Sequence, residues 1–370
     1  MRIVEAAPTT QTSERLYILD ILRFAAALGV TIFHFGFHQW AMERNSPVHF
    51  PELAPWAVYG GLAVPLFFII SGFVIAVSMQ GKTAGQFAFG RFIRLYPTFW
   101  ICLLLTALTL YSWGAEEHQF TLHGFLANLT MIPHLLHQPY LDEPYWTLQV
   151  EIRFYVLMLL LLMLRKGSWL MPFAVVWLGL SAVDWVYGIP VLHVQLTLDN
   201  APFFVAGIVY SQMFRSGAKW HHWAVLATAL IVGTMRVIRD MELDVAGSGW
   251  SVSPAVISTA LAVIFIIFAG IALGKIYLKR SHKWVVALGG MTYPLYLLHN
   301  NIGLIIFNRV NDAMNRWLLF ALMLAGLMVM AFAIWRWIET PILRKFRPRK
   351  TSGLPAAREE LFENAPISAS

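Results

Sequence analysis

The sequence contains few charged residues and almost no cysteine. Of its 370 residues only 13% are charged and 58% are hydrophobic, whereas soluble domains typically hold about 25% and about 45–50% respectively. So much apolar surface needs lipid as its solvent, and a soluble protein is therefore excluded. The single cysteine, Cys102, also excludes a disulfide framework and a metal site made of cysteines.

The charges that are present do not suggest a nucleic-acid partner. The net charge is +7 at pH 7, but no basic stripe interleaved with aromatic residues stands outside the apolar segments, so no nucleic acid is expected. Residues 1–15 are polar and lack a signal-peptide pattern, and we expect a cytoplasmic tail there. The sequence thus indicates an all-α, polytopic protein of the lipid bilayer.

Runs of about 20 mostly apolar residues, the length that crosses a bilayer, predict about ten transmembrane helices. They cover residues 16–41, 54–79, 95–113, 146–165, 169–187, 196–214, 220–236, 251–274, 284–308 and 317–338. We therefore expect one transmembrane domain over 16–346 and a disordered cytoplasmic tail over 347–370.

The distribution of basic residues predicts the orientation of these helices. Cytoplasmic loops carry an excess of Lys and Arg, and 19 of the 27 basic residues fall on the side of the N-terminus if the helices alternate. Only five fall in the opposite loops, namely Arg44, Arg236, Arg239, Arg309 and Arg316. Both termini are therefore expected to be cytoplasmic.

The first span contains ionisable residues, which are costly at bilayer depth and therefore suggest function. Arg23 and His34 are 11 residues apart, which is three helical turns and places both on one face, about 16 Å from each other. The alternative is an Asp20–Arg23 pair and a histidine that merely packs in the core. His38 follows His34 at i+4, but no third ligand is evident, so no metal ion is expected.

Two later spans carry further ionisable groups at a similar depth. Glu151 would lie near the depth of His34, where a carboxylate could orient the imidazole for removing a hydroxyl proton. It could instead only neutralise Arg153 or Arg23. His299 is expected to face the same cavity. A second reading of Arg23, Glu151 and His299 is a secondary transporter or flippase with these groups in a substrate cavity.

Two segments next to the second and third spans also have competing interpretations. Arg91 and Arg94 lie one turn apart, and they either anchor the helix at the cytoplasmic surface or bind phosphates of a cytosolic ligand. Ser71-Gly72 is interpreted as a helix-packing site rather than a nucleophile. The long loop 114–145 is rich in His, Asp and Glu, and a short helix is expected around 122–131.

In their order along the chain, these segments resemble the acyltransferase 3 family of bacterial inner-membrane O-acyltransferases, from about residue 17 to about 344. The shared pieces are R-x10-H (Arg23 and His34), "FFIISGF" (67–73), R-x-x-R (Arg91 and Arg94), "YWTLQVE" (145–151), "TYPLYLLH" (292–299) and "ETP" (339–341). Thr147 stands where the family often has serine, which keeps a hydroxyl.

The resemblance implies transfer of an acyl group, most often acetyl, from cytosolic acyl-CoA to a hydroxyl of a glycan or similar acceptor on the outer side. Arg23, Arg91, Arg94 and Tyr96 are then expected to bind the acyl-CoA donor. His34 would be the general base or a transient acyl carrier, and Glu151 would orient it. Trp146, Tyr296 and His299 are expected to contact the acceptor, and Tyr96, Tyr145, Trp146 and Asn300 are candidates for stabilising the oxyanion.

The end of the chain distinguishes two forms of the family. Some members append an extracytoplasmic SGNH hydrolase-like domain, but only about 24 residues follow the predicted transmembrane domain (16–346) here, so we expect the form without that domain. The segment 339–341 is expected to end this helix, because proline disrupts helical hydrogen bonding.

Overall fold

The computed structural model describes residues 11–43, 46–114, 121–165, 167–278, 282–310 and 313–346. These residues form helices and connections without a strand. The prediction of an all-α protein is thus confirmed for this part of the chain. The tail predicted for 347–370, and most of the one predicted for 1–15, lie outside the described residues.

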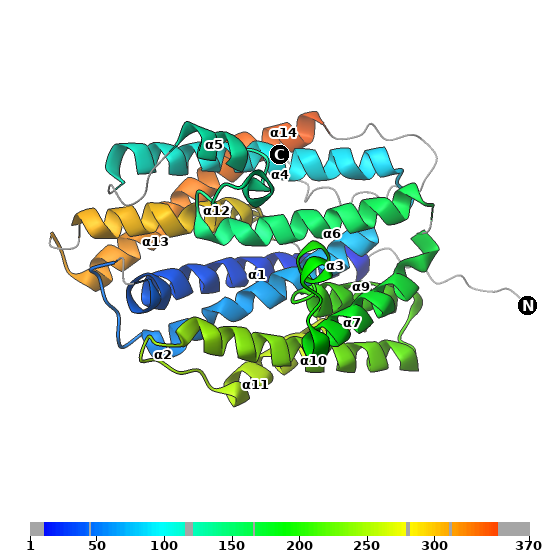
Figure 1. Cartoon of the computed structure of the whole chain (residues 1–370). Coiled ribbons are helices and arrows are strands. Elements are labelled where there is room, and N and C mark those ends of the chain that lie inside the picture. The colour runs from blue at the N-terminus through cyan, green and yellow to red at the C-terminus, as the bar shows by residue number, and fades with distance from the viewer. Residues whose placement is uncertain are drawn as a thin grey trace, which may run out of the picture.

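The first half of the chain, through the long loop, folds into a series of helices that lie roughly side by side (Figure 1). In chain order they are α1 (Gln11–Phe33), η1 (His34–Met42), α2 (Ala54–Ala57), η2 (Val58–Leu62), α3 (Ala63–Ser78), α4 (Ala84–Trp113), α5 (Leu122–Asn128), η3 (Pro133–Leu136), η4 (Glu143–Tyr145) and α6 (Trp146–Met163).

The second half continues this bundle with one further short helix at its C-terminal end. Its elements are η5 (Gly167–Trp169), α7 (Leu170–Tyr187), α8 (Pro190–Gln195), α9 (Ala201–Ser216), α10 (Trp220–Val245), α11 (Pro254–Ala272), α12 (Lys283–Val310), α13 (Arg316–Ile334), η6 (Trp335–Glu339) and α14 (Thr340–Lys345).

Seven helical segments of the described residues are long and apolar enough to cross a membrane. They are Tyr17–Met42, Ala54–Ser78, Ala84–Trp113, Glu143–Met163, Gly167–Tyr187, Pro254–Ala272 and Arg316–Lys345. The protein is thus a multi-pass membrane protein. The other three predicted spans coincide with α9, α10 and α12, which are not among these seven, so the count of ten stays a prediction.

Helix ends follow signals that the sequence carries. Thr83 caps α4 in a reciprocal arrangement, because its side chain accepts from Gln86 N while the Gln86 side chain accepts from Thr83 N. The Asn315 side chain accepts from two backbone N–H groups at the start of α13. These caps fix where the long helices begin.

The expected helix end at the ETP segment is wrong. The last span passes through the π-helix η6, which ends at Glu339, and then continues as α14. Pro341 is the second residue of α14, which directly follows the π-helical segment. The proline therefore follows a π-helical segment inside the last span and does not mark the end of that span.

The helices α3 and α9 cross at very close range. A Cβ atom on Gly72 would collide with the backbone oxygen of Phe204, and one on Gly207 would collide with the backbone oxygen of Ile69. Only glycine permits this approach, which is typical of helix contacts in membranes. The interpretation of Gly72 as a packing residue is therefore confirmed.

Arg236 is a buried residue of α10 rather than a loop residue as predicted. Its side chain is 1% exposed and forms ion pairs with Asp184 at 2.9 Å and with Asp199. The helix α10 extends nine residues beyond the predicted range. Asp184, His193 and Asp199 are close enough to hold a metal ion, but Arg236 already pairs with both carboxylates.

The loop after α4 packs along that helix, and it contains α5 where a short helix was expected (Figure 1). Tyr96 donates to the backbone oxygen of Thr130 at 3.1 Å. At the end of the loop, Asp142 accepts from the Asn300 side chain at 2.9 Å and from Asn301 N at 3.3 Å. Burial raises the pKa of Asp142 to about 7. The Tyr96 bond attaches the loop to α4, and the Asp142 bonds attach it to α12.

Candidate functional site

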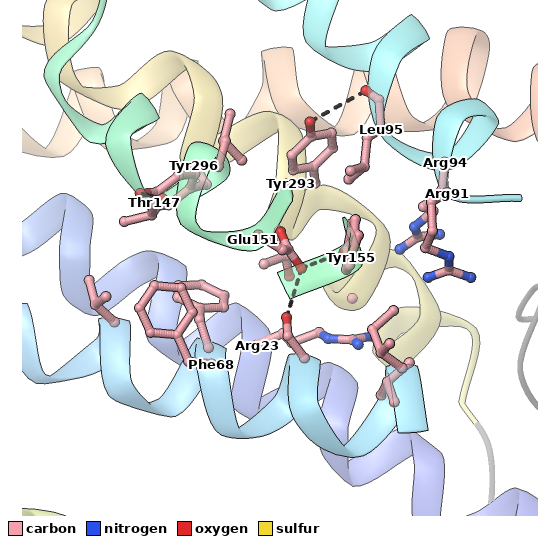
Figure 2. Close-up of a pocket in the computed structure, with 18 residues that line it drawn as sticks. Arg23, Phe68, Arg91, Arg94, Leu95, Thr147, Glu151, Tyr155, Tyr293 and Tyr296 are labelled. Carbon is pink, nitrogen blue, oxygen red and sulfur yellow. Dashed lines mark hydrogen bonds between the residues drawn. The ribbon is translucent and has the colours of Figure 1, made fainter. Parts of the chain in front are cut away.

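The sequence-predicted arginines meet in one cavity of about 140 Å³, called here the arginine cavity. Figure 2 shows Arg91 and Arg94 of α4 at one end of this cavity. Glu151 of α6 lies near the middle of the cavity, and Arg23 of α1 lies along one side. The remaining walls are mostly apolar and aromatic, including Phe67, Phe68, Val74, Ile75, Leu95, Leu148, Tyr293 and Tyr296. A narrow apolar chamber therefore has a cationic end.

Two hydroxyl groups hold Glu151 in this cavity. Its Oε1 accepts from Ser71 Oγ at 2.8 Å and from Tyr155 OH at 2.5 Å, as the dashed lines in Figure 2 mark. Ser71 thus faces the cavity, one residue before the glycine that packs on α9.

The three arginines are engaged to different extents. Arg94 Nη1 lies 3.4 Å from Glu339 Oε1, and Arg23 Nη1 lies 3.7 Å from Asp20 Oδ1. Arg91 Nε is buried without a hydrogen-bond partner among the described residues, and its guanidinium lies 5.9 Å from the centre of the Phe87 ring. Arg23 and Arg94 thus each have a carboxylate partner, whereas Arg91 has none among the described residues and can bind an anionic ligand.

A second and larger cavity, called here the histidine cavity, has a volume of about 420 Å³. His34 and His38 of the π-helix η1 line it together with Glu143 of η4. Its other charged lining residues are Asp199, Arg236, Asp240 and Asp244. Because Arg236 is already paired with Asp199, the lining is acidic.

His34 is placed for proton transfer in the histidine cavity. Its Nε2 lies 3.9 Å from Glu143 Oε2, and the residue is only 4% exposed. Its ring centre lies 4.9 Å from that of His38 and 4.9 Å from that of His299. π-Helical segments are frequent at functional sites, and this one begins at His34. A buried imidazole beside a carboxylate can accept a hydroxyl proton.

The predicted contact between His34 and Glu151 is wrong. Glu151 lines the arginine cavity, whereas His34 lines the histidine cavity, and their hydrogen-bonding and ionic neighbours differ. The carboxylate that approaches His34 comes instead from Glu143, at the end of the long loop. Among the described residues, Arg153 lines neither cavity.

His299 also lies elsewhere than predicted. It is fully buried and packs behind His34, and it is not among the residues that line either cavity. Its Nδ1 lies 2.8 Å from the backbone oxygen of Tyr296. His299 therefore supports the His34 ring and is not placed to contact an acceptor.

The remaining predicted residues differ in whether they line one of the two cavities. Trp146 lines the histidine cavity, and Tyr296 lines both cavities, which agrees with a place near a substrate. Tyr96 lines neither one and points to the long loop, so its expected contact with a donor is not seen. Tyr145 donates to the backbone oxygen of Leu297 at 3.0 Å and is 2% exposed.

Sequence reasoning missed several residues that complete the site. Ser71 and Tyr155 hold Glu151, Glu143 faces His34, and Glu339 binds Arg94. Glu339 also accepts from Thr98 Oγ1 at 3.3 Å. The signal was present for Tyr155, which follows Glu151 at i+4 and so shares its helix face.

Comparison with known proteins identifies relatives of this chain. Residues 16–336 match the model of a family described as an acyltransferase domain, acyltransferase 3. The chain is 26% identical over 316 residues to the acyltransferase MdmB of Streptomyces mycarofaciens, covering 77% of this chain and 78% of that protein. It is 23% identical over 358 residues to nodulation protein 10 of Rhizobium leguminosarum bv. viciae, covering 88% and 92%. No solved structure matches significantly.

Proposed function

The chain belongs to the acyltransferase 3 family and is a membrane acyltransferase, and from this premise we propose that it transfers a short acyl group, most simply acetyl, from cytosolic acyl-CoA to a hydroxyl acceptor. The acceptor is a glycan or a similar molecule on the outer side of the bacterial inner membrane. The observation that carries the proposal is the pairing of an arginine cavity with a histidine cavity in one helical bundle.

The arginine cavity is the proposed donor site. CoA carries several phosphate charges, and planar guanidinium groups bind phosphate oxygens with two donors at once. Arg91 has no competing carboxylate among the described residues, so it is available to a ligand. The apolar walls beyond the arginines suit the less polar arm that ends in the thioester.

His34 is the proposed general base. It takes the proton of the acceptor hydroxyl, whose oxygen attacks the thioester carbonyl to give a tetrahedral intermediate. Collapse of that intermediate releases CoA as a thiolate, which receives the proton from His34 and leaves as the thiol. General-base assistance of this kind contributes about 10²–10⁴-fold in rate. Glu143 stabilises the protonated imidazole between the two steps.

The charge of the histidine cavity limits the acceptor. Four of its lining residues are carboxylates, and Glu143 and Asp244 have no cationic partner among the described residues apart from the His34 contact. Like charges repel strongly in a partly desolvated cavity. The acceptor is therefore expected to be uncharged or cationic near its reacting hydroxyl rather than a polyanion.

A transporter or flippase is the less supported function. That interpretation placed Arg23, Glu151 and His299 around one substrate, but His299 lines neither cavity. The family assignment independently favours an enzyme.

The purified full-length protein in lipid nanodiscs separates the two cavities experimentally. We expect Arg91→Gln to weaken acetyl-CoA binding about 10-fold, because a phosphate loses a charged partner. His34→Ala should bind acetyl-CoA normally but lose transfer, since it removes the base and leaves the arginine cavity intact. Isothermal titration measures binding. Mass spectrometry of glycans and metabolites from cells expressing each variant measures transfer, as a gain of about 42 Da per acetyl group.

A surface variant provides the matched control. His123→Ala removes an exposed histidine of α5 that lines neither cavity, and it should bind and transfer as the wild type does. Transfer at the normal rate in His34→Ala would remove His34 from the mechanism. Unchanged acetyl-CoA binding in Arg91→Gln would leave Arg91 with only an anchoring role.

A further inference from the structure

The two cavities meet at three side chains. Val64, Thr147 and Tyr296 are the residues that the lining of the arginine cavity shares with that of the histidine cavity, within the part of the chain that the structure describes. Figure 2 shows Thr147 and Tyr296 next to each other at the end of the arginine cavity opposite to Arg91 and Arg94. They thus form the partition between the donor site and the base.

Hydrogen bonds close this partition. Thr147 Oγ1 lies 2.5 Å from Tyr296 OH. Both hydroxyls also lie within bonding distance of the backbone oxygen of Pro144, Thr147 at 3.0 Å and Tyr296 at 2.8 Å. The hydroxyls of Thr147 and Tyr296 thus have two protons between them for these three contacts. The bonds connect η4 and α6 on one side with α12 on the other.

These bonds can be broken without disturbing a helix. Each of the two hydroxyls is held only by neutral partners, and neutral hydrogen bonds are weaker than charge-assisted ones. Rotation of the Tyr296 and Thr147 side chains about their χ1 angles would separate the hydroxyls while the backbone stays in place. Pro144 directly follows Glu143, the carboxylate that faces His34. A movement of Pro144 would therefore shift Glu143 relative to His34.

We propose that Thr147 and Tyr296 form a gate through which the acyl thioester passes from the arginine cavity to His34, and that the width of this gate limits the cross-section of the acyl group. The inference rests on the proposed donor and base sites, because a thioester held at Arg91 must cross this partition to meet a hydroxyl at His34. A narrow passage admits the small acetyl group and disfavours a branched acyl group, which has a larger cross-section.

The preference for acyl groups of different cross-section tests the gate. Tyr296→Leu and Thr147→Ala both widen the partition, and each should raise the ratio of kcat/KM for the branched isobutyryl-CoA to that for acetyl-CoA by about 10-fold or more, because even one methylene in a pocket can change specificity by that factor. Tyr210→Leu is the matched control, since Tyr210 is a buried tyrosine of α9 that lines neither cavity. Its ratio should equal that of the wild type.

A reversible cross-link gives a second measurement that does not depend on fold stability. In a Cys102→Ser background, Thr147→Cys and Tyr296→Cys are bridged with a short bifunctional thiol reagent that a reductant can cleave. We expect the bridged protein to bind acetyl-CoA but not to transfer, and reduction to restore transfer. Cys102 is the only native cysteine, so no other bridge can form.

The outcomes separate the gate from the function on which it rests. A wild-type protein that transfers from no acyl-CoA overturns the proposed function itself. A wild-type protein that transfers, with an unchanged ratio for isobutyryl-CoA to acetyl-CoA in both widened variants, overturns the gate alone. Continued transfer by the fully bridged protein overturns it as well.

Discussion

At the scale of single residues, we expect His299 to position the ring of His34. The backbone oxygen of Tyr296, 2.8 Å from His299 Nδ1, can only accept, so Nδ1 carries the proton of the neutral ring and Nε2 holds a lone pair. Neither His299 Nε2 nor His34 Nδ1 has a partner among the described residues, and the ring centres are 4.9 Å apart. A hydrogen bond from His34 Nδ1–H to His299 Nε2 would leave His34 Nε2 as the basic nitrogen.

Removal of His299 should therefore affect the chemical step. We expect His299→Ala to lower kcat about 10-fold or more while the KM for acetyl-CoA stays unchanged, because the tautomer and orientation of His34 are no longer fixed. The pH at which the rate is half-maximal should also move. A purely structural residue would lower the amount of active protein without moving the pH profile, and that result would contradict the positioning role.

The sequence predicted which arginines would lie together, but it predicted neither the depth nor the neighbours of Glu151. Arg23, Arg91 and Arg94 do share one cavity, as expected from counting residues along each helix. Glu151 was expected at the depth of His34, but it lies with Arg23 in the arginine cavity, one helical turn beyond Thr147, which lines both cavities. Glu143 reached His34 through the fold of a long loop, for which the sequence contains no periodic signal.

At the scale of helices, the crossing of α3 and α9 should be sensitive to a single added methyl group. The Cβ of Gly207→Ala would collide with backbone atoms of Ile69, Gly72 and Phe73, and backbone cannot move aside as a flexible side chain can. We expect a loss of about 1–3 kcal/mol in stability, as for other overpacked positions. Thermal unfolding of the detergent-purified variant should show a lower midpoint.

Gly179→Ala is the matched control for this crossing. Gly179 lies within α7, and a Cβ there would meet no atom within 4 Å. The added methyl should leave the midpoint unchanged or raise it slightly, because alanine favours helix more than glycine does. Equal midpoints for the two variants would mean that the crossing tolerates separation. The sequence predicted small residues at Gly72, but α9 as the partner helix is visible only in the assembled bundle.

At the scale of the whole molecule, charged residues decide how many helices the sequence reveals as spans. The helix α10 holds 26 residues, about 39 Å at 1.5 Å per residue, which is enough to cross a bilayer. It is nonetheless absent from the seven apolar segments. The charge of Arg236 is paired with Asp184 and Asp199. A charge that lowers the hydropathy of α10 is therefore buried in protein and does not face lipid.

The sidedness of α10 tests both the count of ten helices and the cytoplasmic placement of the termini. Ala218 and Ala246 are exposed residues that flank the two ends of α10. In intact cells, a membrane-impermeant maleimide should label Ala246→Cys, whereas Ala218→Cys should be labelled only after the membrane is permeabilised. The wild type is the control, because Cys102 is fully buried. Labelling of both positions from the same side would mean that α10 does not cross. The reversed pattern would place the arginine cavity, and with it the proposed acyl-CoA site, toward the outer face.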